Sequence, residues 1–304
     1  RVLEQAKAIT LPNEREILHV LPQEFKVDSH RGIKDPLGHL AHRLEARVHL
    51  VTVVSAAAQN IIRCVEAAGL YVENVVLAPL ASACSVLEET EKEQGVVLID
   101  MGGGTTDLIV YFDGGVRQTA VIPFGGDRIT HDIAQVLRST FQKAEELKRD
   151  YGSAKFTAAE EDSEITIAGI AGRHEQKTTR KGLAAIIEPR VEEILTLCRN
   201  EIIKSEVSDK LTFGVVITGG GSLLREIAEK GGEIFNMDIK VGYPMHMGGL
   251  DDMAGTPEFA TATGLLLYGL EHQNKYGIPR RPRGTGFFLR GLSDKIGGFF
   301  KDLF

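Results

Sequence analysis

The chain has 304 residues, 43% of them hydrophobic and 25% charged, a composition that predicts a folded protein of two domains or of one large domain split into lobes. Its net charge of −7 is uneven, because residues 280–304 hold six basic and two acidic side chains, a net +4, and the remainder therefore carries −11. The acidic body argues against nucleic acid as a main partner, three distant cysteines without a CxxC pair favour a reducing cytosolic compartment, and the absence of an 18-residue apolar run argues against a transmembrane helix.

The first 95 residues show short strand patterns followed by helical ones, with Gly and Pro residues at the turns between them. Because the chain opens with Arg1 and not with methionine, we expect it to be a piece of a longer protein. The elements predicted in this part are strands at 17–21, 24–27, 46–54 and 72–78 and helices at 55–69 and 81–90.

A glycine-rich loop in residues 96–110, VVLIDMGGGTTDLIV, is the most informative motif. An apolar strand ends in Asp100, turns through three glycines and two threonines, and leads into a second apolar strand at 108–112. Consecutive glycines let backbone N–H groups approach an anion, and an acid at a strand end suits a hydrated divalent cation. Since a strand and not a helix follows, the loop is neither a Walker loop nor a Rossmann turn.

The middle of the chain contains a second triple glycine, Gly219–Gly221, directly after an apolar strand. Here a helix is expected to follow, capped by Ser222, and the glycines would let a flat ring and a ribose lie against the backbone. The elements predicted from residue 117 onward are strands at 117–123, 165–170 and 213–218 and helices at 129–139, 143–151, 183–206, 223–230 and 259–271.

The end of the chain has a linker at 277–286, GIPRRPRGTG, and an amphipathic pattern at 287–304. Apolar residues there recur mostly every three or four positions, which predicts a helix with one apolar face, typical of a helix lying in a membrane interface. A helix docked on its own body or in a partner's groove is the alternative. The membrane-binding side chains predicted are Phe288, Leu292, Ile296, Phe299, Phe300, Leu303 and Phe304.

The two glycine motifs, DMGGGTTD and ITGGGS, resemble the second phosphate motif and the adenosine motif of actin-like ATPases. HVLPQEFKVD (19–28), VIPFGGDRIT (121–130) and above all GYPMHMGGLDDM…PEFATATGLLLYG (242–269) resemble the FtsA family of bacterial cell-division proteins. The resemblance runs over nearly the whole chain. It implies an α/β fold, an actin-like (ribonuclease H-like) core of two lobes with a family-specific inserted subdomain and a C-terminal amphipathic helix.

The resemblance also implies a division of the chain into parts. These are part of the FtsA-specific subdomain at 1–72, first-lobe segments at 73–95 and 253–276, second-lobe core segments at 96–142 and 211–252, the upper subdomain of the second lobe at 143–210, the linker at 277–286 and the membrane helix at 287–304.

ATP with Mg²⁺ is the cofactor that the resemblance implies. Gly102, Gly103, Gly104, Thr105 and Thr106 would hold the β- and γ-phosphates, Asp100 would place the magnesium ion through water, Gly219, Gly220, Gly221 and Ser222 would bind adenosine, and Glu145 and Lys148 would reach the ribose and adenine. From the residues alone, Lys148 could equally be a solvated helix charge.

Two departures from the superfamily pattern bear on catalysis. No Asp-x-Gly turn of the superfamily's first phosphate motif precedes residue 96. Ala78 occupies the position at which hydrolysing relatives often have the Glu or Gln that orients the attacking water. We therefore expect no catalytic residue and at most a weak ATPase.

The implied function is an ATP-binding division protein that polymerises, tethers FtsZ filaments to the inner face of the cytoplasmic membrane at the division site, and helps to recruit later division proteins. Arg180, Lys181, Arg190 and Glu193 would receive the acidic C-terminal peptide of FtsZ, although Arg190 and Glu193 could instead form only a surface pair. A small-molecule kinase and a chaperone-like ATPase are the alternatives. We find neither a kinase's substrate acid nor a chaperone's β-rich domain after the core.

Overall fold

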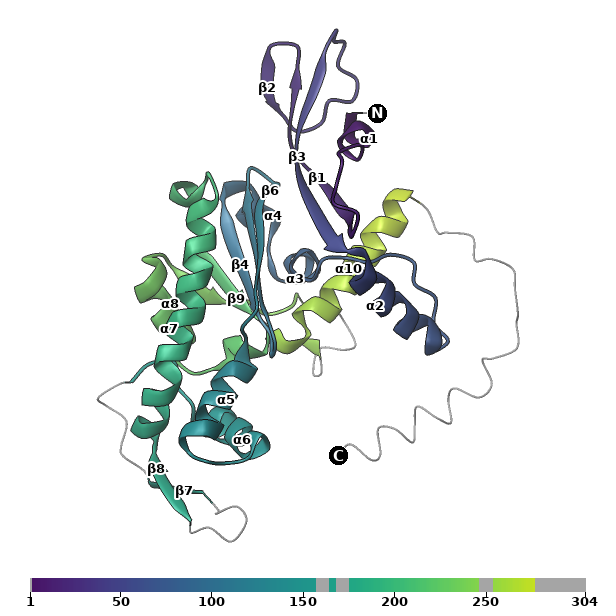
Figure 1. Ribbon diagram of the computed structural model, residues 1–304. Helices are drawn as coiled ribbons and strands as arrows, with labels where there is room; N and C mark the ends of the chain where they lie inside the picture. The colour runs from purple at the N-terminus through teal and green to yellow at the C-terminus, as the bar shows by residue number, and fades with distance from the viewer. Residues whose placement is uncertain (1, 157–163, 168–174, 246–253, 277–304) are drawn as a thin grey trace. The chain divides into compact units, whose positions relative to one another are not determined.

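The computed structural model describes residues 2–156, 164–167, 175–245 and 254–276 (Figure 1). It divides into two compact units, residues 1–268 and 269–304. The predicted linker and membrane helix lie outside the described residues.

The N-terminal part is a small antiparallel sheet of order β2-β1-β3, preceded by helix α1 (Val2–Ala6). Strand β1 (Arg15–Val27) joins the two short strands predicted at 17–21 and 24–27, because the register with β3 (Leu44–Val54) shifts between Pro22 and Glu24 and so accommodates the proline. Strand β2 (His30–Ile33) and helix α1 were not predicted.

The region between this sheet and the first glycine loop is helical. Helix α2 (Ser55–Ala67) agrees with its prediction. The strand predicted at 72–78 is wrong, because residues 70–77 are irregular and none of the described strands pairs with them. The single helix predicted at 81–90 is two helices, α3 (Ala78–Val86) and α4 (Glu89–Gln94), since Glu88 and Glu91 form a capping box that starts a new helix.

A five-stranded mixed sheet of order β10-β9-β4-β5-β6 forms the centre of the unit. Strands β4 (Val96–Met101), β5 (Thr106–Phe112) and β6 (Gly115–Ile122) are antiparallel neighbours, whereas β9 (Val215–Thr218) and β10 (Ile239–Val241) run parallel to β4. Both faces are covered, because Val97 and Ile99 pack in one apolar cluster and Val96 and Leu98 in another. The buried strand pair predicted around the first glycine loop is confirmed.

Helices cover one face of this sheet in the larger cluster, which includes residues of α5 (Gly126–Val136), α6 (Phe141–Tyr151), α7 (Arg180–Lys204) and α8 (Ile227–Phe235). The smaller cluster packs α3 and Ala260 against the other face. A hairpin of β7 (Glu164–Ile167) and β8 (Gln176–Thr179) precedes α7, and β8 was not predicted.

The segment after the second glycine loop differs from its prediction. Short turns of 3₁₀-helix, η2 (Gly220–Leu223), come first, and α8 begins only at Ile227. Two further 3₁₀ turns, η1 (Ser208–Lys210) and η3 (Pro257–Phe259), precede β9 and helix α10 (Ala260–Tyr276), which ends the described part of the chain.

Candidate functional site

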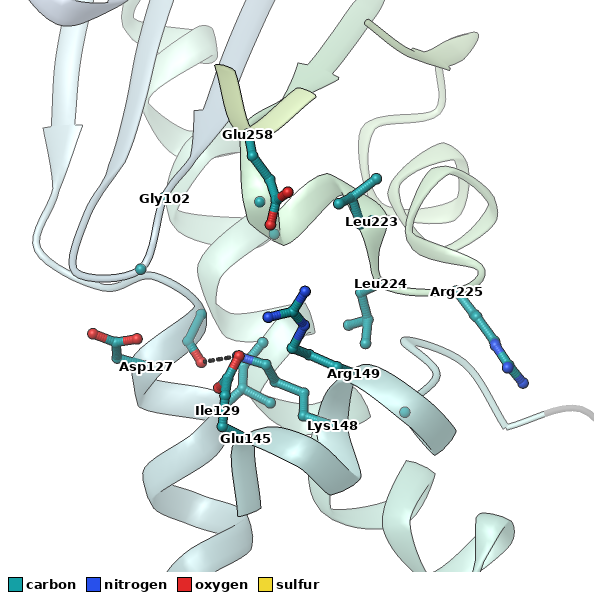
Figure 2. A pocket seen from close by; sticks show the side chains of 15 residues that line it. Gly102, Asp127, Ile129, Glu145, Lys148, Arg149, Leu223, Leu224, Arg225 and Glu258 are labelled. Atoms are coloured by element: carbon teal, nitrogen blue, oxygen red, sulfur yellow. Dashed lines mark hydrogen bonds and ion pairs between the residues drawn. The ribbon is translucent and has the colours of Figure 1, made fainter. Parts of the chain in front are cut away.

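A pocket of about 410 Å³ lies where the two glycine loops meet the start of α5 and the helix α6 (Figure 2). This volume is in the range of small-ligand sites. Its lining comprises Gly102, Gly103, Gly126, Asp127, Ile129, Glu145, Lys148, Arg149, Gly152, Gly220, Gly221, Leu223, Leu224, Arg225 and Glu258. Six of the residues predicted for nucleotide binding are among them, two from each glycine loop and two from α6.

The two loops meet because their strands are parallel neighbours in the sheet. Strand β4 pairs with β9, with Asp100 opposite Thr218, so both strands end at the same edge. Ligands of α/β proteins commonly bind at the carboxyl ends of such strands. Sequence reasoning predicted each loop, and the parallel pairing brings them together.

The first glycine loop is fixed to the start of α5. The N–H groups of Gly126 and Asp127 donate to the carbonyl oxygens of Gly102 and Gly103, each at 2.9 Å. A Cβ at Gly125 would lie 2.5 Å from both of those oxygens, so no larger residue fits there without moving the loop. The sequence predicted only a helix at 129–139 here, although glycines before a helix N-terminus are also a signal of close backbone approach.

The side chains of Glu145 and Lys148 form an ion pair inside the pocket, with 2.7 Å between Oε2 and Nζ. Lys148 Nζ also donates to Gly126 O at 3.1 Å and to Thr130 Oγ1 at 2.9 Å. Burial raises the pKa of Glu145, but the hydrogen bonds from Lys148 and Thr130 outweigh it and leave the pKa below its ordinary value. Lys148 is therefore a partly buried, hydrogen-bonded cation and not a solvated helix charge.

Asp100 lies near the end of β4, directly before the first glycine loop, and is only 8% exposed. Its Oδ2 accepts hydrogen bonds from Ser82 Oγ at 2.5 Å and from Thr261 Oγ1 at 2.9 Å, so it joins β4 to α3 and α10. Gly219 has φ +81°, and a Cβ there would lie 2.4 Å from Asp100 Oδ1. Asp100 does not line the pocket. Neither Ser82 nor Thr261 was singled out from the sequence.

Four other residues predicted to bind the nucleotide are not in the pocket lining: Gly104, Thr105, Thr106 and Ser222. Gly104 is exposed, Thr105 Oγ1 donates to Asp107 at 3.1 Å, and Thr106 Oγ1 donates to Phe124 O at 2.8 Å. Ser222 is buried and its hydroxyl donates to Gly219 O at 2.7 Å. The expected helix cap by Ser222 is wrong, because that hydroxyl closes the turn of the second loop and α8 starts after Glu226.

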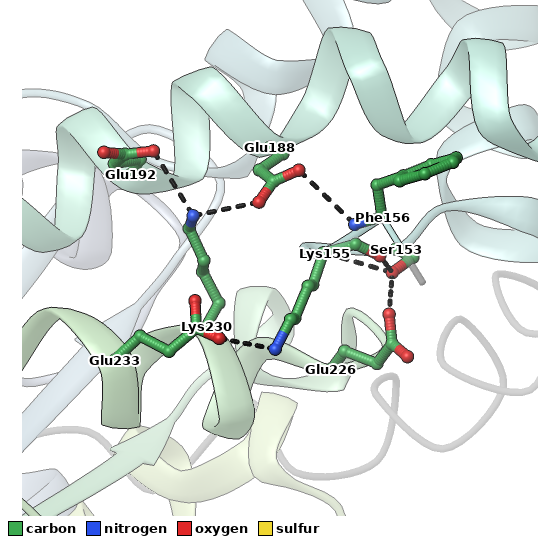
Figure 3. A network of polar contacts seen from close by, with 8 residues as sticks. All are labelled: Ser153, Lys155, Phe156, Glu188, Glu192, Glu226, Lys230 and Glu233. Atoms are coloured by element: carbon green, nitrogen blue, oxygen red, sulfur yellow. Dashed lines mark hydrogen bonds and ion pairs between the residues drawn. The ribbon is translucent and has the colours of Figure 1, made fainter. Parts of the chain in front are cut away.

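A polar network supports the wall of the pocket formed by Gly152, Leu224 and Arg225 (Figure 3). Ala154 N–H donates to Arg225 O at 2.8 Å, and Ser153 Oγ donates to Glu226 at 2.5 Å. The same figure shows the ion pairs Lys155–Glu233, Lys230–Glu188 and Lys230–Glu192. These contacts hold the chain that leaves α6 against α7 and α8. Sequence reasoning missed them, because the partners are far apart in the chain.

The four predicted partner-binding residues fall into two places on α7. Arg190 pairs with Glu193 and also binds Asp132 of α5 through two nitrogens, at 2.5 and 3.2 Å. Arg180 lies over the ring of Tyr151 and Lys181 over that of Phe156, at 5.9 and 5.3 Å from the centroids. The ten-residue spacing of Arg180 and Arg190 on α7 separates these two places by about 15 Å along the helix axis. The predicted membrane-binding residues lie outside the described part of the chain.

Neither a membrane span nor a metal-ligand cluster is found in the described residues. No helix there is both long and apolar enough to cross a bilayer. No three His, Cys, Asp or Glu side chains of this part come together as metal ligands.

The chain is similar to known proteins in both sequence and structure. The family model described as "Cell division protein FtsA" matches residues 97–264, and that described as "SHS2 domain inserted in FTSA" matches residues 1–52. Cell division protein FtsA of Pseudomonas aeruginosa is 42% identical over 90% of this chain and 66% of its own length. The corresponding protein of Borreliella burgdorferi is 41% identical over 99% and 73%, and that of Escherichia coli K12 is 38% identical over 89% and 66%.

Two solved structures share the fold at low sequence identity. MreB5 of Spiroplasma citri bound to ADP has a TM-score of 0.62 and 19% identity, covering 74% of this chain and 69% of its own. The PilM-PilN type IV pilus biogenesis complex has a TM-score of 0.61 and 19% identity, covering 88% and 70%. The chain thus spans between 66 and 73% of the sequence relatives named above.

Proposed function

The chain belongs to the FtsA family of cell-division proteins and has an actin-like fold, and from this premise we propose that it is an ATP-binding switch that polymerises and links FtsZ filaments to the membrane. In this proposal it acts at the division site, as a peripheral protein on the cytoplasmic side, and helps to recruit later division proteins. The observation that supports ATP binding most is the meeting of both glycine loops with Lys148 and Glu145 in one pocket.

The lining of that pocket suits a nucleotide that brings a metal ion. It contains three cations and three carboxylates, so it offers little net charge to a bare triphosphate. A triphosphate partly neutralised by Mg²⁺ fits this balance better. Gly102 and Gly103, which carry no side chain, would leave room for phosphates, Glu145 and Lys148 would reach the ribose and adenine, and the second loop would hold adenosine. As general support, MreB5 of Spiroplasma citri has been solved with ADP and with AMPPNP.

Asp100 is the residue proposed to place Mg²⁺ through water. Ser82 and Thr261 both donate to Oδ2 of this carboxylate, and in this proposal Oδ1 would accept from a water molecule of the hydrated ion. The ion would neutralise phosphate charge when bound. Hydrolysis would be slow, since Ala78 begins α3 where a water-orienting side chain would be needed.

The test of ATP binding uses the full-length protein and two lysines of the same helix. Lys148→Met removes the pocket cation and is expected to weaken binding of Mg-ATP at least about tenfold, measured by isothermal titration calorimetry. Lys143→Met is the matched control, because Lys143 pairs with Glu146 on the exposed face of α6. Equal affinity of the two variants for Mg-ATP, with both folded by circular dichroism, would contradict the proposal.

A further inference from the structure

A second pocket, of about 320 Å³, lies between the N-terminal sheet and the central sheet, near the end of α7. Strands β1, β3 and β6 contribute to it, together with the end of β5 and the segment from α7 to η1. Its lining comprises Gln23, Arg47, Phe112, Arg117, Gln118, Lys204, Ser205, Glu206, Val207 and Lys210. None of these residues has a part in the proposed nucleotide site or in the predicted FtsZ-binding and membrane-binding sites.

The charge of this lining is opposite to that of the body of the protein. It holds four cations, Arg47, Arg117, Lys204 and Lys210, and one carboxylate, Glu206. Residues 1–279 together carry −11, so this positively charged cluster is opposite in sign to the net charge of the surrounding protein. Cations that converge on a concave surface attract an anion most strongly where water is partly excluded.

Arg117 is held in place for such a contact. Its side chain is 15% exposed, and its Nε donates to Phe112 O at 3.0 Å. The guanidinium carbon lies 5.7 Å from the centroid of the Phe112 ring. A carboxylate oxygen of Asp113 is 3.9 Å from Nη2, too far for a hydrogen bond, so the terminal nitrogens of Arg117 remain able to donate to a ligand.

Lys210 lies over the same aromatic ring. Its Nζ is 5.7 Å from the Phe112 centroid, and none of the described carboxylates forms an ion pair with it. Two cations near one ring repel each other, and an anion that binds both would offset that repulsion. Phe112 and the buried Val207 are the apolar side chains of this lining.

The other two cations, Arg47 and Lys204, form ion pairs that cost little to break. Arg47 pairs with Glu206 at 2.6 Å and Lys204 with Glu201 at 2.5 Å. Arg47 and Lys204 are more than half exposed, and such exposed ion pairs contribute little stability. Both cations can therefore turn towards a ligand without a large cost.

We propose that this cationic pocket binds a phosphate group. A lining of net +3 suits a dianion better than a single carboxylate, and the planar fork of an arginine matches phosphate oxygens. The phosphate belongs either to a free phosphate compound or to a lipid headgroup. Because the lining comes from both the N-terminal sheet and the elements around β6, the bound group would strengthen the attachment between these two parts.

The experiment uses the full-length protein with Phe299→Glu and Phe300→Glu, which disable the proposed membrane helix. Binding of pyrophosphate is measured by calorimetry with saturating Mg-ATP present, and binding to phosphatidylglycerol and phosphatidylcholine vesicles by co-sedimentation. Arg117→Gln with Lys210→Gln is expected to weaken binding at least about tenfold. Lys210→Gln alone, at an exposed side chain, is expected to weaken it by about threefold or more and guards against misfolding of the double variant.

Matched controls and outcomes separate the possibilities. Lys26→Gln, on β1, removes an ion pair with Glu45 of β3 and is expected to leave binding unchanged. Pyrophosphate binding by Lys148→Gln is measured without ATP, so that failure of the proposed nucleotide site and failure of the proposed phosphate pocket can be told apart. Saturable pyrophosphate binding that requires Lys210 supports a free phosphate compound, and binding to phosphatidylglycerol vesicles alone supports a headgroup. Binding of neither, binding unaffected by the substitutions, or binding only of an Asp- and Glu-rich peptide would overturn the proposal.

Discussion

At the scale of single residues, the polar groups that matter most are those that join distant segments. Asp100 joins β4 to α3 and α10 through Ser82 and Thr261, and His19 joins the N-terminal sheet to the segment before α3. The sequence did not predict these contacts, because a hydroxyl or an imidazole carries no sign of which distant backbone it will meet. The family resemblance pointed to Lys148 and Glu145, which are neighbours on one helix and both line the pocket, and their role toward a nucleotide stays a prediction.

Ser82→Ala tests the contacts of Asp100. Ser82 is fully buried, and its loss would leave a nearly buried carboxylate with one hydrogen-bond donor fewer. We expect the free energy of unfolding to fall by about 1–3 kcal/mol, measured by urea denaturation. Ser139→Ala, whose hydroxyl is exposed, is the control and is expected to stay within about 0.5 kcal/mol. A Ser82 variant as stable as this control would show that the carboxylate does not depend on the serine.

His19 predicts how stability depends on pH. Its Nε2 accepts the N–H of Leu77 at 3.1 Å, which only the neutral imidazole can do, and burial lowers the pKa of His19 below its ordinary value of 6.5. The unfolded chain therefore binds a proton more readily than the folded one as the pH falls. The contribution of His19 is complete above pH 6.5 and decreases as the pH falls below it.

The measurement is the urea midpoint between pH 7.5 and 5, for the parent and for His19→Gln. Burial also lowers the pKa of His49, which contacts Thr119 at 2.9 Å, so the variant should keep part of the pH dependence and lose the rest. A midpoint with the same pH dependence in both proteins would contradict the assignment to His19.

At the scale of elements, periodicity and glycine position predicted most of the strands and helices near the pocket. The strand pair around the first loop, the helix at 143–151 and the strand before the second loop all appear, with ends shifted by a few residues. The strand predicted at 72–78 failed because an apolar run becomes a strand only if a neighbour pairs with it. The delayed start of α8 was missed because Ser222 bonds to its own loop and not to a helix N-terminus.

The attachment of the first glycine loop to α5 can be tested at two glycines. Gly125→Ala places a Cβ 2.5 Å from two carbonyl oxygens, so we expect a loss of roughly 2–4 kcal/mol of stability and of most Mg-ATP affinity. Gly232→Ala in α8 is the matched control, because a Cβ there would meet only Met237 O, at 3.8 Å, and Gly232 does not line the pocket. The two readouts are thermal denaturation and calorimetric titration. Equal behaviour of both variants would contradict the fixed-loop geometry.

At the scale of the whole molecule, family membership shows a cell-division protein, and the division-site tether is our proposal over a small-molecule kinase or a chaperone. The proposed mechanism joins polymerisation to membrane binding. A single amphipathic tail binds weakly, since each buried aromatic or leucine side chain contributes at most about 1.5–3 kcal/mol before its ordering cost. Alignment of many tails along a filament would raise the avidity by roughly 10²–10⁴.

Replacement of Phe299 and Phe300 by Glu tests the tail. Charges on the apolar face are expected to release the full-length protein from phosphatidylglycerol liposomes in a co-sedimentation assay. Replacement of both residues by Leu keeps the face apolar and should preserve most of the binding. Retention of the Glu variant on liposomes would favour a tail docked on protein.

The central claim, that the pocket of the two glycine loops serves a nucleotide switch and not a working hydrolase, is tested most directly by one measurement. This is the turnover of ATP by the full-length protein under conditions in which Mg-ATP binding is shown to be saturated. We predict saturable binding that depends on Lys148, with turnover far below one per second. Turnover near the typical enzyme range of about 1–10³ s⁻¹, or no saturable binding at all, would contradict the account.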